Sequence, residues 1–412
     1  MFNRVITFLN QPIQAPVGAK YKYNVAVEQY RGLCALMVMA CHGIVATDML
    51  FSNGFKWPEF ASYIGAGYLS VIIFFCISGY VIGLTNNNQN FGTWQYLKKR
   101  MTRLYPTYIV SIILCIVVAG GVSLYVLLGN LFFIQNDLPY YHFHMPIFVN
   151  YATWSLNNEA LYYLLFILII YLRPKIWQLL LLLVAGSILL IHTSNSFLFL
   201  GGYVNGFYFW MLGLLIGWNI IKGNDEIPVK PIPLLSLMFL HLCQHHLGVG
   251  QMILHTIGIY TSSDLNWLGD IPFCLMVMCT LTGRDSTFLR FNKLLCYLTP
   301  AAVFTFLLAH HRIFEDVRWV MCLIYWVLSL AFYFGKTISA YVAGKLAGVG
   351  KISYAIYLVH VPVALLIKKF VFINNRDLEV AVKYLLWIGI TFSLSIVLER
   401  YLQPAVKKEL AR

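Results

Sequence analysis

Two ionisable residues near the amino terminus have a spacing that would place both on one face of a helix. Arg31 and His42 are eleven positions apart, in a largely apolar stretch that begins after Glu28. At 100° per residue their directions differ by about 20°, and they are separated by about 16 Å along the axis. A guanidinium binds phosphate, and an imidazole takes up a proton near neutral pH. The pair predicts proton transfer at His42 with an anion held near Arg31, while a packing or hydrogen-bonding role for His42 stays open.

A second candidate is the carboxylate of Glu159, in the segment Trp154-Ser-Leu-Asn-Asn-Glu159. It lies about 9 Å into the apolar stretch if a helix begins near Trp154. An ionisable group inside a membrane costs about 2.5–3.5 kcal/mol or more, so it is a functional candidate by default. A buried carboxylate also needs a partner or takes up a proton. The alternative is a structural Glu159 that is satisfied by helix ends or by Asn157 and Asn158.

A third group lies near the carboxyl end, where Tyr357 and His360 follow Lys351. Residues three apart share one face of a helix, so the tyrosine and the histidine are neighbours. His360 lies about 13 Å beyond Lys351 along such a helix. These depths predict that His42, Glu159 and His360 approach one level of a helical bundle.

A cluster of basic residues, Lys98, Lys99, Arg100 and Arg103, precedes Pro106. Proline is compatible with the first turn of a helix, where the backbone N–H groups lack intrahelical partners. Basic residues at a helix start suit a polyphosphate ligand. The alternative is a cytoplasmic loop whose charges only set the membrane topology.

The remaining histidines and the cysteines do not specify a metal site. His241 and His245 have the i, i+4 spacing of two metal ligands, but the sequence indicates no third ligand. The nine cysteines lie in or beside apolar runs, and none forms a Cys-x-x-Cys pair. We therefore predict neither a bound metal nor a disulfide framework.

The elements that position these groups must reside in lipid. The chain has 412 residues, of which 60% are hydrophobic and 11% are charged, with a mean hydropathy of +0.72. Soluble domains contain about 25% charged residues, so a soluble protein is excluded. The net charge of +13 does not indicate nucleic acid, because the basic residues cluster between apolar runs as in cytoplasmic loops.

A membrane-crossing helix needs about 20 largely apolar residues. The sequence predicts about twelve such spans, and ten or eleven are also compatible with it. They lie near 30–50, 63–84, 104–128, 153–172, 176–193, 200–221, 232–250, 265–283, 295–311, 317–335, 352–370 and 382–402. The fold class is therefore an all-α, polytopic membrane helix bundle.

The distribution of Lys and Arg predicts that the amino terminus is cytoplasmic. No Lys or Arg occurs between Leu104 and Leu172, which places the loop 129–152 outside. The basic residues at predicted cytoplasmic ends are Lys20, Lys22, Arg31, Lys98, Lys99, Arg100, Arg103, Arg173, Lys175, Arg284, Arg290, Lys293, Lys407, Lys408 and Arg412. Three residues on a predicted outer loop run against the rule: Lys368, Lys369 and Arg376.

This topology predicts one membrane domain with two short flanks. Residues 1–27 form a cytoplasmic amino-terminal segment, which is too polar and too interrupted by proline to be a signal peptide. Residues 28–404 form the transmembrane domain, and residues 405–412 form a cytoplasmic tail. No internal repeat or low-complexity tract is visible in the chain.

Taken together, the motifs resemble those of acyltransferase family 3, the membrane O-acetylases that modify O-antigen and other envelope glycans. Five motifs in order carry the resemblance: Arg31-x10-His42; Phe74-Phe75-x-x-Ser78-Gly79; Lys99-Arg100-x-x-Arg103 with Pro106; Trp154-Ser-Leu-x-x-Glu159; and Ser353-Tyr-x-x-Tyr357-Leu-x-His360 with the later Glu399 and Pro404. Ser70 and Ile72 depart from the family pattern, which has Gly and a polar residue there. The stretch 284–345 is longer than usual, which would add helices.

The resemblance implies a helix bundle with a central cavity and transfer of an acyl group, usually acetyl, from cytoplasmic acyl-CoA. The acceptor would be a hydroxyl of a cell-envelope or exported glycan, or of a lipid-linked saccharide. It implies a multi-pass protein of the bacterial cell membrane, with acyl-CoA as a co-substrate, no tightly bound cofactor and lipid as the surrounding partner.

The resemblance also implies roles for individual residues. His42 would be the catalytic group, assisted by Glu159. Three arginines would serve the donor: Arg31, Arg100 and Arg103. Four residues would shape or support the cavity: Ser78, Trp154, Tyr357 and His360.

The chemistry leaves two mechanisms open for His42. As a general base it would remove the proton of the acceptor hydroxyl; as a nucleophile it would form an acyl-imidazole. We favour the base, because direct transfer needs fewer steps when the acceptor and the thioester meet in one cavity. Transfer of succinyl or a longer acyl group is equally compatible with the sequence.

A transporter or flippase for a glycan or lipid-linked substrate is the alternative from another class. Several ionisable groups at mid-membrane depth would suit proton coupling. Against this, the sequence shows no repeat and no pair of interrupted helices at corresponding positions.

Overall fold

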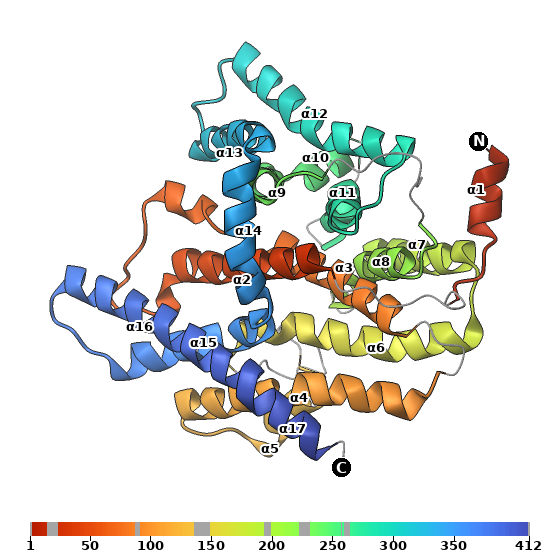
Figure 1. The fold of residues 1–412 in the computed structure, drawn as a ribbon. Helices are drawn as coiled ribbons and strands as arrows, with labels where there is room; N and C mark the ends of the chain where they lie inside the picture. Colours follow the sequence, from red (N-terminus) through yellow and green to blue (C-terminus); the bar gives the residue numbers. More distant parts are fainter. Residues whose placement is uncertain are drawn as a thin grey trace. The chain divides into compact units, whose positions relative to one another are not determined.

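The computed structural model describes residues 2–14, 24–86, 91–135, 149–192, 199–221, 231–256, 258 and 264–410. Over these residues the chain is helical and contains no strand, as Figure 1 shows, which confirms the predicted fold class. Parts of the sequence-based topology lie outside the described residues: Lys20, Lys22, Arg412 and the segment 136–148 of the predicted outer loop.

Contacts divide the chain into two compact units that alternate along the sequence. The first unit comprises Met1–Val27, Val71–Thr93 and Asn158–Ser339. The second unit comprises Glu28–Ser70, Trp94–Asn157 and Ala340–Arg412. His42 and His360 therefore belong to the second unit, and Glu159 belongs to the first.

The first unit holds the greater part of two long apolar helices, α3 and α6, and most of the middle of the chain. Its helices are α1 (Phe2–Leu9), α3 (Tyr68–Thr85), α6 (Trp154–Leu172), α7 (Ile176–His192), α8 (Phe199–Gly217), α9 (Leu234–Leu247), α10 (Val249–Thr256), η5 (Asp264–Asp270), α11 (Ile271–Leu281), α12 (Thr287–Ala309) and α13 (Val317–Phe334). Helices α9, α12 and α13 pack together, as can be followed in Figure 1.

The second unit combines the amino-terminal motif helix with the carboxyl-terminal third of the chain. Its helices are α2 (Val25–Val45), η1 (Thr47–Met49), η2 (Glu59–Tyr63), α4 (Thr93–Ala119), α5 (Leu124–Leu131), η3 (Tyr151–Thr153), α14 (Lys336–Gly350), α15 (Ser353–Phe370), α16 (Arg376–Val397), the π-helical turn η6 (Leu398–Leu402) and α17 (Gln403–Glu409). In this unit α15 packs along α16 and touches η1 and η3.

The described helices support a polytopic membrane protein. Seven helical stretches in the described ranges are long and apolar enough to cross a membrane: Glu59–Thr85, Thr93–Ala119, Tyr151–Leu172, Thr287–Ala309, Val317–Phe334, Ser353–Phe370 and Arg376–Glu409. Three shorter helices are also apolar: Ile176–Ile188, Tyr203–Gly217 and Trp267–Leu281. Helix α2 is not among them, because Glu28, Arg31 and His42 make it more polar.

The third predicted span begins earlier than expected. Helix α4 starts at Thr93, so the basic residues and Pro106 lie inside it and not at its start. Our prediction of a first-turn proline was therefore wrong, and the basic cluster is not at a helix N-terminus. The apolar run begins only at Leu104, but Gln, Lys and Arg are good helix formers and extend the helix on its polar side.

Two prolines inside helices are accommodated by side chains from other elements. Pro362 has no N–H for the carbonyl of Leu358, four residues earlier. That carbonyl accepts hydrogen bonds from the Asn150 amide at 2.8 Å and the Ser111 hydroxyl at 2.9 Å. In lipid an unsatisfied carbonyl is costly, so these donors allow α15 to continue past Pro362.

The same arrangement recurs in the first unit at Pro300 of α12. The carbonyl that this proline leaves without a partner belongs to Cys296, and the Gln244 amide of α9 donates to it at 2.8 Å. At each proline, polar side chains from outside the helix bind the carbonyl that lacks its N–H partner.

Glycine allows close packing of α3 on α8. A side chain at Gly79 would overlap the backbone of Trp210, and one at Gly213 would overlap the backbone of Cys76. Small residues at a contact let two membrane helices approach until their backbones touch, which gives van der Waals contact where lipid offers no hydrophobic driving force.

The basic residues that disagreed with the topology rule have structural partners. The Lys369 ammonium donates to the carbonyls of Val117 and Val118, in the last turn of α4. Such carbonyls lack intrahelical partners and carry partial negative charge. Lys368 donates to the carbonyl of Asp48 at 2.6 Å. Both lysines therefore satisfy backbone carbonyls, which gives a local reason for their presence in this loop.

All nine cysteines are free thiols. Eight are buried, and Cys41 of α2 is half-buried.

Candidate active site

The two histidines of the sequence motifs meet in the second unit. His42 Nδ1 lies 2.7 Å from His360 Nε2, and the two rings are nearly parallel, with centroids 5.1 Å apart and an interplanar angle of 8°. His360 is fully buried, and His42 is half-buried. The predicted approach of His42 and His360 is therefore found, although 318 residues separate them in the chain.

The hydrogen bonds determine which nitrogen atoms carry protons. His360 Nδ1 lies 3.0 Å from the carbonyl oxygen of Ile356, which can only accept, so Nδ1 is the donor. Neutral His360 then presents an unprotonated Nε2. His42 Nδ1–H donates to that lone pair, which leaves His42 Nε2 unprotonated. This chain of two hydrogen bonds produces an imidazole with a basic nitrogen opposite its anchored side.

Backbone and aromatic contacts hold the two imidazoles in place. Tyr151 of η3 lies edge-on to the His42 ring with centroids 5.1 Å apart. Trp387 of α16 donates its indole N–H to the His360 carbonyl at 2.7 Å. The same indole ring fills the space beside Gly43, where a side chain would overlap it. The histidine pair is thus held by contacts from α2, α15, α16 and η3.

Tyr357 links α15 to the start of α6. Its hydroxyl donates to the Ala152 carbonyl at 2.8 Å, and the Ser155 hydroxyl lies 2.8 Å away and donates to it. The Tyr357 and His360 rings are 6.2 Å apart. Trp154 is the first residue of α6 and is half-buried. Tyr357 therefore connects the helix of His360 to the start of α6.

Arg31 lies on the same helix as His42 and forms an ion pair. Its Nη1 is 3.1 Å from Glu28 Oε1, one turn earlier in α2. The side chains are 22% and 17% exposed, so the pair is partly accessible. A partly exposed arginine with a single local carboxylate retains donors that an incoming anion can meet.

Arg103 connects α4 to the π-helical turn η6. Its Nη1 lies 2.6 Å from Glu399 Oε2 and 2.6 Å from the Gln403 side-chain oxygen. The Tyr354 ring covers the guanidinium at 4.9 Å. Glu399 is 5% exposed, so this carboxylate depends on Arg103 for its neutralisation. Arg103 thus has a structural contact that its predicted role in donor binding did not include.

Arg100 lies one turn earlier on α4. Its guanidinium is 5.5 Å from the centroid of the Tyr96 ring, and its side chain is half-buried. Lys98 and Lys99 are exposed. The cluster therefore presents two solvated lysines and one arginine that is packed on an aromatic ring.

Glu159 has its own partners in the first unit. Its Oε1 accepts hydrogen bonds from the Ser78 hydroxyl of α3 and the Tyr163 hydroxyl of α6, each at 2.5 Å. Asn157 does not satisfy it, because the Asn157 amide donates to the carbonyl of Gln135. The structure therefore brings together two predicted site residues, Glu159 and Ser78, with Tyr163 as a third member that the sequence did not indicate.

Three residues around the histidine pair were not predicted: Asn150, Tyr151 and Trp387. A proline inside an apolar helix signals that some donor must reach the carbonyl four residues earlier, which points to a residue such as Asn150 without naming it. Tyr151 and Trp387 carry no signal of this kind, because aromatic residues are common throughout this chain.

No group of three or more His, Cys, Asp or Glu side chains in the described part of the chain is arranged to hold a metal ion. His241 is buried against Phe273, and the His245 and His246 rings are in contact at 4.7 Å.

Comparison with known proteins bears on the identity of this helix bundle. Searches of curated proteins and of solved structures gave no match. The family model for the acyltransferase domain of acyltransferase family 3 matches residues 24–400, which include every motif residue discussed above except Pro404. The match covers nearly the whole chain and favours an acyltransferase over a transporter. The chain belongs to acyltransferase family 3 and is a membrane acyltransferase.

Proposed function

We propose that the protein transfers an acetyl group from cytoplasmic acetyl-CoA to a hydroxyl of a cell-envelope or exported glycan, with His42 as the general base. The observation that carries this proposal is the hydrogen-bonded chain from His42 through His360 to the Ile356 carbonyl. It leaves His42 Nε2 with a lone pair, which is the state that a base for an acceptor hydroxyl requires.

The proposed reaction proceeds through one proton cycle at His42. Nε2 removes the proton of the acceptor hydroxyl while the alkoxide oxygen attacks the thioester carbonyl carbon. The carbon–sulfur bond then breaks, and the CoA sulfur receives the proton from Nε2. The products are the O-acetylated glycan and CoA, and His42 returns to its starting tautomer. During the cycle Nδ1–H remains bound to His360, which keeps the ring in one orientation.

The other predicted residues have supporting roles in this proposal. Arg31 and Arg100 would meet the phosphates of the donor, because both are partly accessible. Arg103 would serve the donor while keeping its contact with Glu399. Glu159, bound by Ser78, would assist the reaction.

We further propose that the protein lies in the bacterial cell membrane with its amino terminus in the cytoplasm. Charge distribution supports this orientation, because the segment from Leu104 to Leu172 lacks Lys and Arg. The donor would then approach the side on which Arg31 lies.

The decisive experiment compares glycan acetylation in cells that carry wild-type protein, His42→Ala or the control His310→Ala. His310 is an exposed histidine outside the site. Mass spectrometry of the surface polysaccharide should show acetyl groups with the wild type and the control, and none with His42→Ala. Immunoblotting of membranes should show equal amounts of all three proteins.

Wild-type acetylation by His42→Ala would contradict the catalytic assignment. Acetylation that does not depend on the gene at all would contradict the proposed acceptor. In that case release of CoA by the purified protein, tested with succinyl-CoA and longer acyl-CoA, would identify the acyl group.

A further inference from the structure

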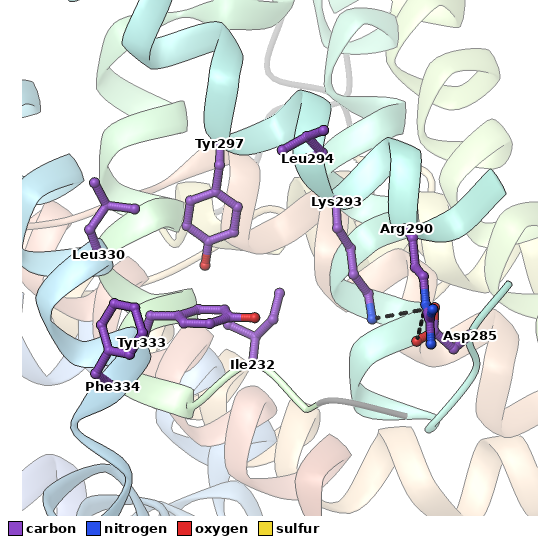
Figure 2. Close-up of a pocket in the computed structure, with 9 residues that line it drawn as sticks. All are labelled: Ile232, Asp285, Arg290, Lys293, Leu294, Tyr297, Leu330, Tyr333 and Phe334. Carbon is purple, nitrogen blue, oxygen red and sulfur yellow. Dashed lines mark hydrogen bonds and ion pairs between the residues drawn. The ribbon is translucent and has the colours of Figure 1, made fainter. Parts of the chain in front are cut away.

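A cavity in the first unit is lined by none of the predicted site residues. It has a volume of about 500 Å³ and is formed by the start of α12, the end of α13 and the segment before α9 (Figure 2). These helix ends carry Arg290 and Lys293, which the topology predicts to be cytoplasmic. No predicted role of the acyltransferase uses this cavity.

One wall of the cavity is positively charged. Arg290 Nε lies 3.2 Å from Asp285 Oδ2, and Lys293 Nζ lies 4.0 Å from Asp285 Oδ1, so two cations share one carboxylate. Figure 2 shows the three side chains gathered at one side of the cavity. Lys293 is only 14% exposed, and its ammonium donates no hydrogen bond to any residue that the structure describes. The wall therefore has net positive charge and available donors for an anion.

The remaining lining of the cavity is mostly apolar and aromatic. Tyr297 and Leu294 come from α12, and Leu330 and Tyr333 come from α13. The Tyr297 hydroxyl is paired with Ser236 at 3.0 Å. The Tyr333 hydroxyl has no hydrogen-bond partner among the described residues and faces the cavity in Figure 2. Such a wall accepts a hydrocarbon chain and offers one further donor to a polar head.

The apolar wall continues onto the outer surface of the two helices. Leu294 is 54% exposed and Phe334 is 83% exposed at the rim of the cavity. Further apolar residues follow on the same helices and are also exposed: Phe291, Leu298 and Val327. Because α12 and α13 are long enough to cross the membrane, these side chains contact lipid tails. A ligand in the cavity can therefore extend its tail into the bilayer.

We infer that this cavity binds the phosphate head group of an anionic phospholipid, with the acyl chains along the surface of α12 and α13. Lys293, Arg290 and the Tyr333 hydroxyl contact the phosphate, and Leu294 and Phe334 contact the first part of the chains. A basic pocket between helices at the cytoplasmic face suits such head groups. The volume holds a head group with its glycerol, while complete chains must lie outside.

The test uses the full-length protein, delipidated in detergent, with four probes. These are phosphatidylglycerol, zwitterionic phosphatidylcholine of the same chains, inorganic phosphate and palmitoyl-CoA. Native mass spectrometry and the thermal unfolding midpoint report binding. We expect phosphatidylglycerol to bind and to raise the midpoint, with weaker effects from phosphatidylcholine and none from phosphate.

Two variants connect binding to the cavity. Lys293→Gln leaves Arg290 to neutralise Asp285, and Tyr333→Phe removes a hydroxyl that no described residue uses, so both should fold. Each should weaken phosphatidylglycerol binding, by about tenfold for Lys293→Gln, because a charged hydrogen bond is lost. The control Lys345→Gln changes an exposed lysine elsewhere and should bind as the wild type does.

Three results would overturn the inference. Equal stabilisation by phosphatidylglycerol and phosphatidylcholine would show that the cavity does not select an anionic head group. Competition by inorganic phosphate would show that the tail contributes nothing. Binding of palmitoyl-CoA without phosphatidylglycerol would instead assign the cavity to a soluble acyl donor.

Discussion

At the residue scale, the state of His42 depends on a carbonyl that it does not touch. The Ile356 oxygen holds the proton of His360 on Nδ1, and His360 in turn holds the proton of His42 on Nδ1. The orientation of both rings follows from these two contacts. His360 therefore acts as a positioning residue in the proposed reaction.

Replacing His360 by Ala should lower kcat while leaving the KM for the acyl donor unchanged. The lost hydrogen bond is worth about 1 kcal/mol or somewhat more, which corresponds to roughly a tenfold slower reaction. By comparison, loss of the base itself in His42→Ala should slow the reaction about 10²- to 10⁴-fold. Steady-state release of CoA by the purified variants measures both effects.

His360→Gln provides the check, because its side-chain oxygen can still accept from His42 Nδ1–H. It should recover part of the activity that His360→Ala loses. Equal activities of wild type and His360→Ala, with intact folding, would show that His42 does not need this contact.

Two substitutions of Glu159 can separate its structural role from a role in the reaction. Glu159→Ala leaves the hydroxyls of Ser78 and Tyr163 without their acceptor, which should destabilise the protein by about 1–3 kcal/mol. Glu159→Gln retains an oxygen that accepts both bonds and should keep most of the stability. Thermal unfolding in detergent measures the change in stability. Acyl transfer by Glu159→Gln measures whether the reaction needs the carboxylate charge.

If Glu159→Gln is both stable and fully active, the carboxylate has no role in the reaction. The Ser78→Ala variant serves as the control, since it removes one donor while Tyr163 still binds the carboxylate.

The sequence could predict the approach of His42 and His360, because the depth of each in the membrane follows separately from its distance to a basic residue on the same helix. The sequence predicts Arg31 and Lys351 at the membrane surface, and helix geometry then predicts similar levels for His42 and His360. Partners such as Asn150 and Trp387 could not be predicted, because they bind backbone carbonyls and leave no pattern in side-chain type or spacing.

At the element scale, the prolines show how a polar side chain joins two helices. Asn150 and Ser111 bind the carbonyl that Pro362 leaves without an N–H partner, two residues before His360. Gln244 does the same for Pro300. The position of His360 is thus coupled to the segment that precedes α6.

Asn150→Ala should destabilise the protein by about 1 kcal/mol, since the buried Leu358 carbonyl loses one of its two side-chain donors and keeps Ser111. The loss should be smaller in a Pro362→Ala background, where residue 362 regains an N–H that can bind the Leu358 carbonyl. A double-mutant cycle in thermal unfolding measures this coupling.

The same cycle with Gln244→Ala and Pro300→Ala is a matched comparison in the other unit. Additive effects in both cycles would show that Asn150 and Gln244 do not replace the hydrogen bonds that the prolines cannot donate.

Arg103 joins α4 to η6, and its removal should have two separable effects. Arg103→Ala leaves Glu399 buried without its cation, which should destabilise the protein by about 3–5 kcal/mol. The double variant Arg103→Ala with Glu399→Gln should recover most of this loss. If Arg103 also serves the donor, the KM for acyl-CoA should stay raised in the double variant.

A normal KM in the stable double variant would leave Arg103 with the structural contact alone. The start of α4 explains why the sequence did not predict this contact. Hydropathy marks the lipid-embedded part of a helix, whereas α4 extends eleven residues further on its polar side, to Thr93.

At the scale of the whole molecule, the helical class and the positions of seven of the twelve predicted spans follow from composition and hydropathy. The division into two interleaved units does not, because it depends on contacts between segments far apart in the chain. The lysines at 368 and 369 also show a limit of charge rules, since both bind backbone carbonyls.

The orientation can be tested with single cysteines at Ser123 and Ala405, which are both exposed. A membrane-impermeant maleimide should label Ser123→Cys in intact cells and Ala405→Cys only after permeabilisation. The reverse pattern would place the amino terminus outside and would contradict the proposed access of acyl-CoA.

Because eight of the nine native thiols are buried, the remaining one can carry a spectroscopic label. Only Cys41 is partly accessible, and it is the residue next to His42 in α2. A small thiol-reactive fluorophore should therefore modify a single position without prior mutagenesis. Changes in its emission upon addition of acetyl-CoA would then report binding of the donor near His42 in real time.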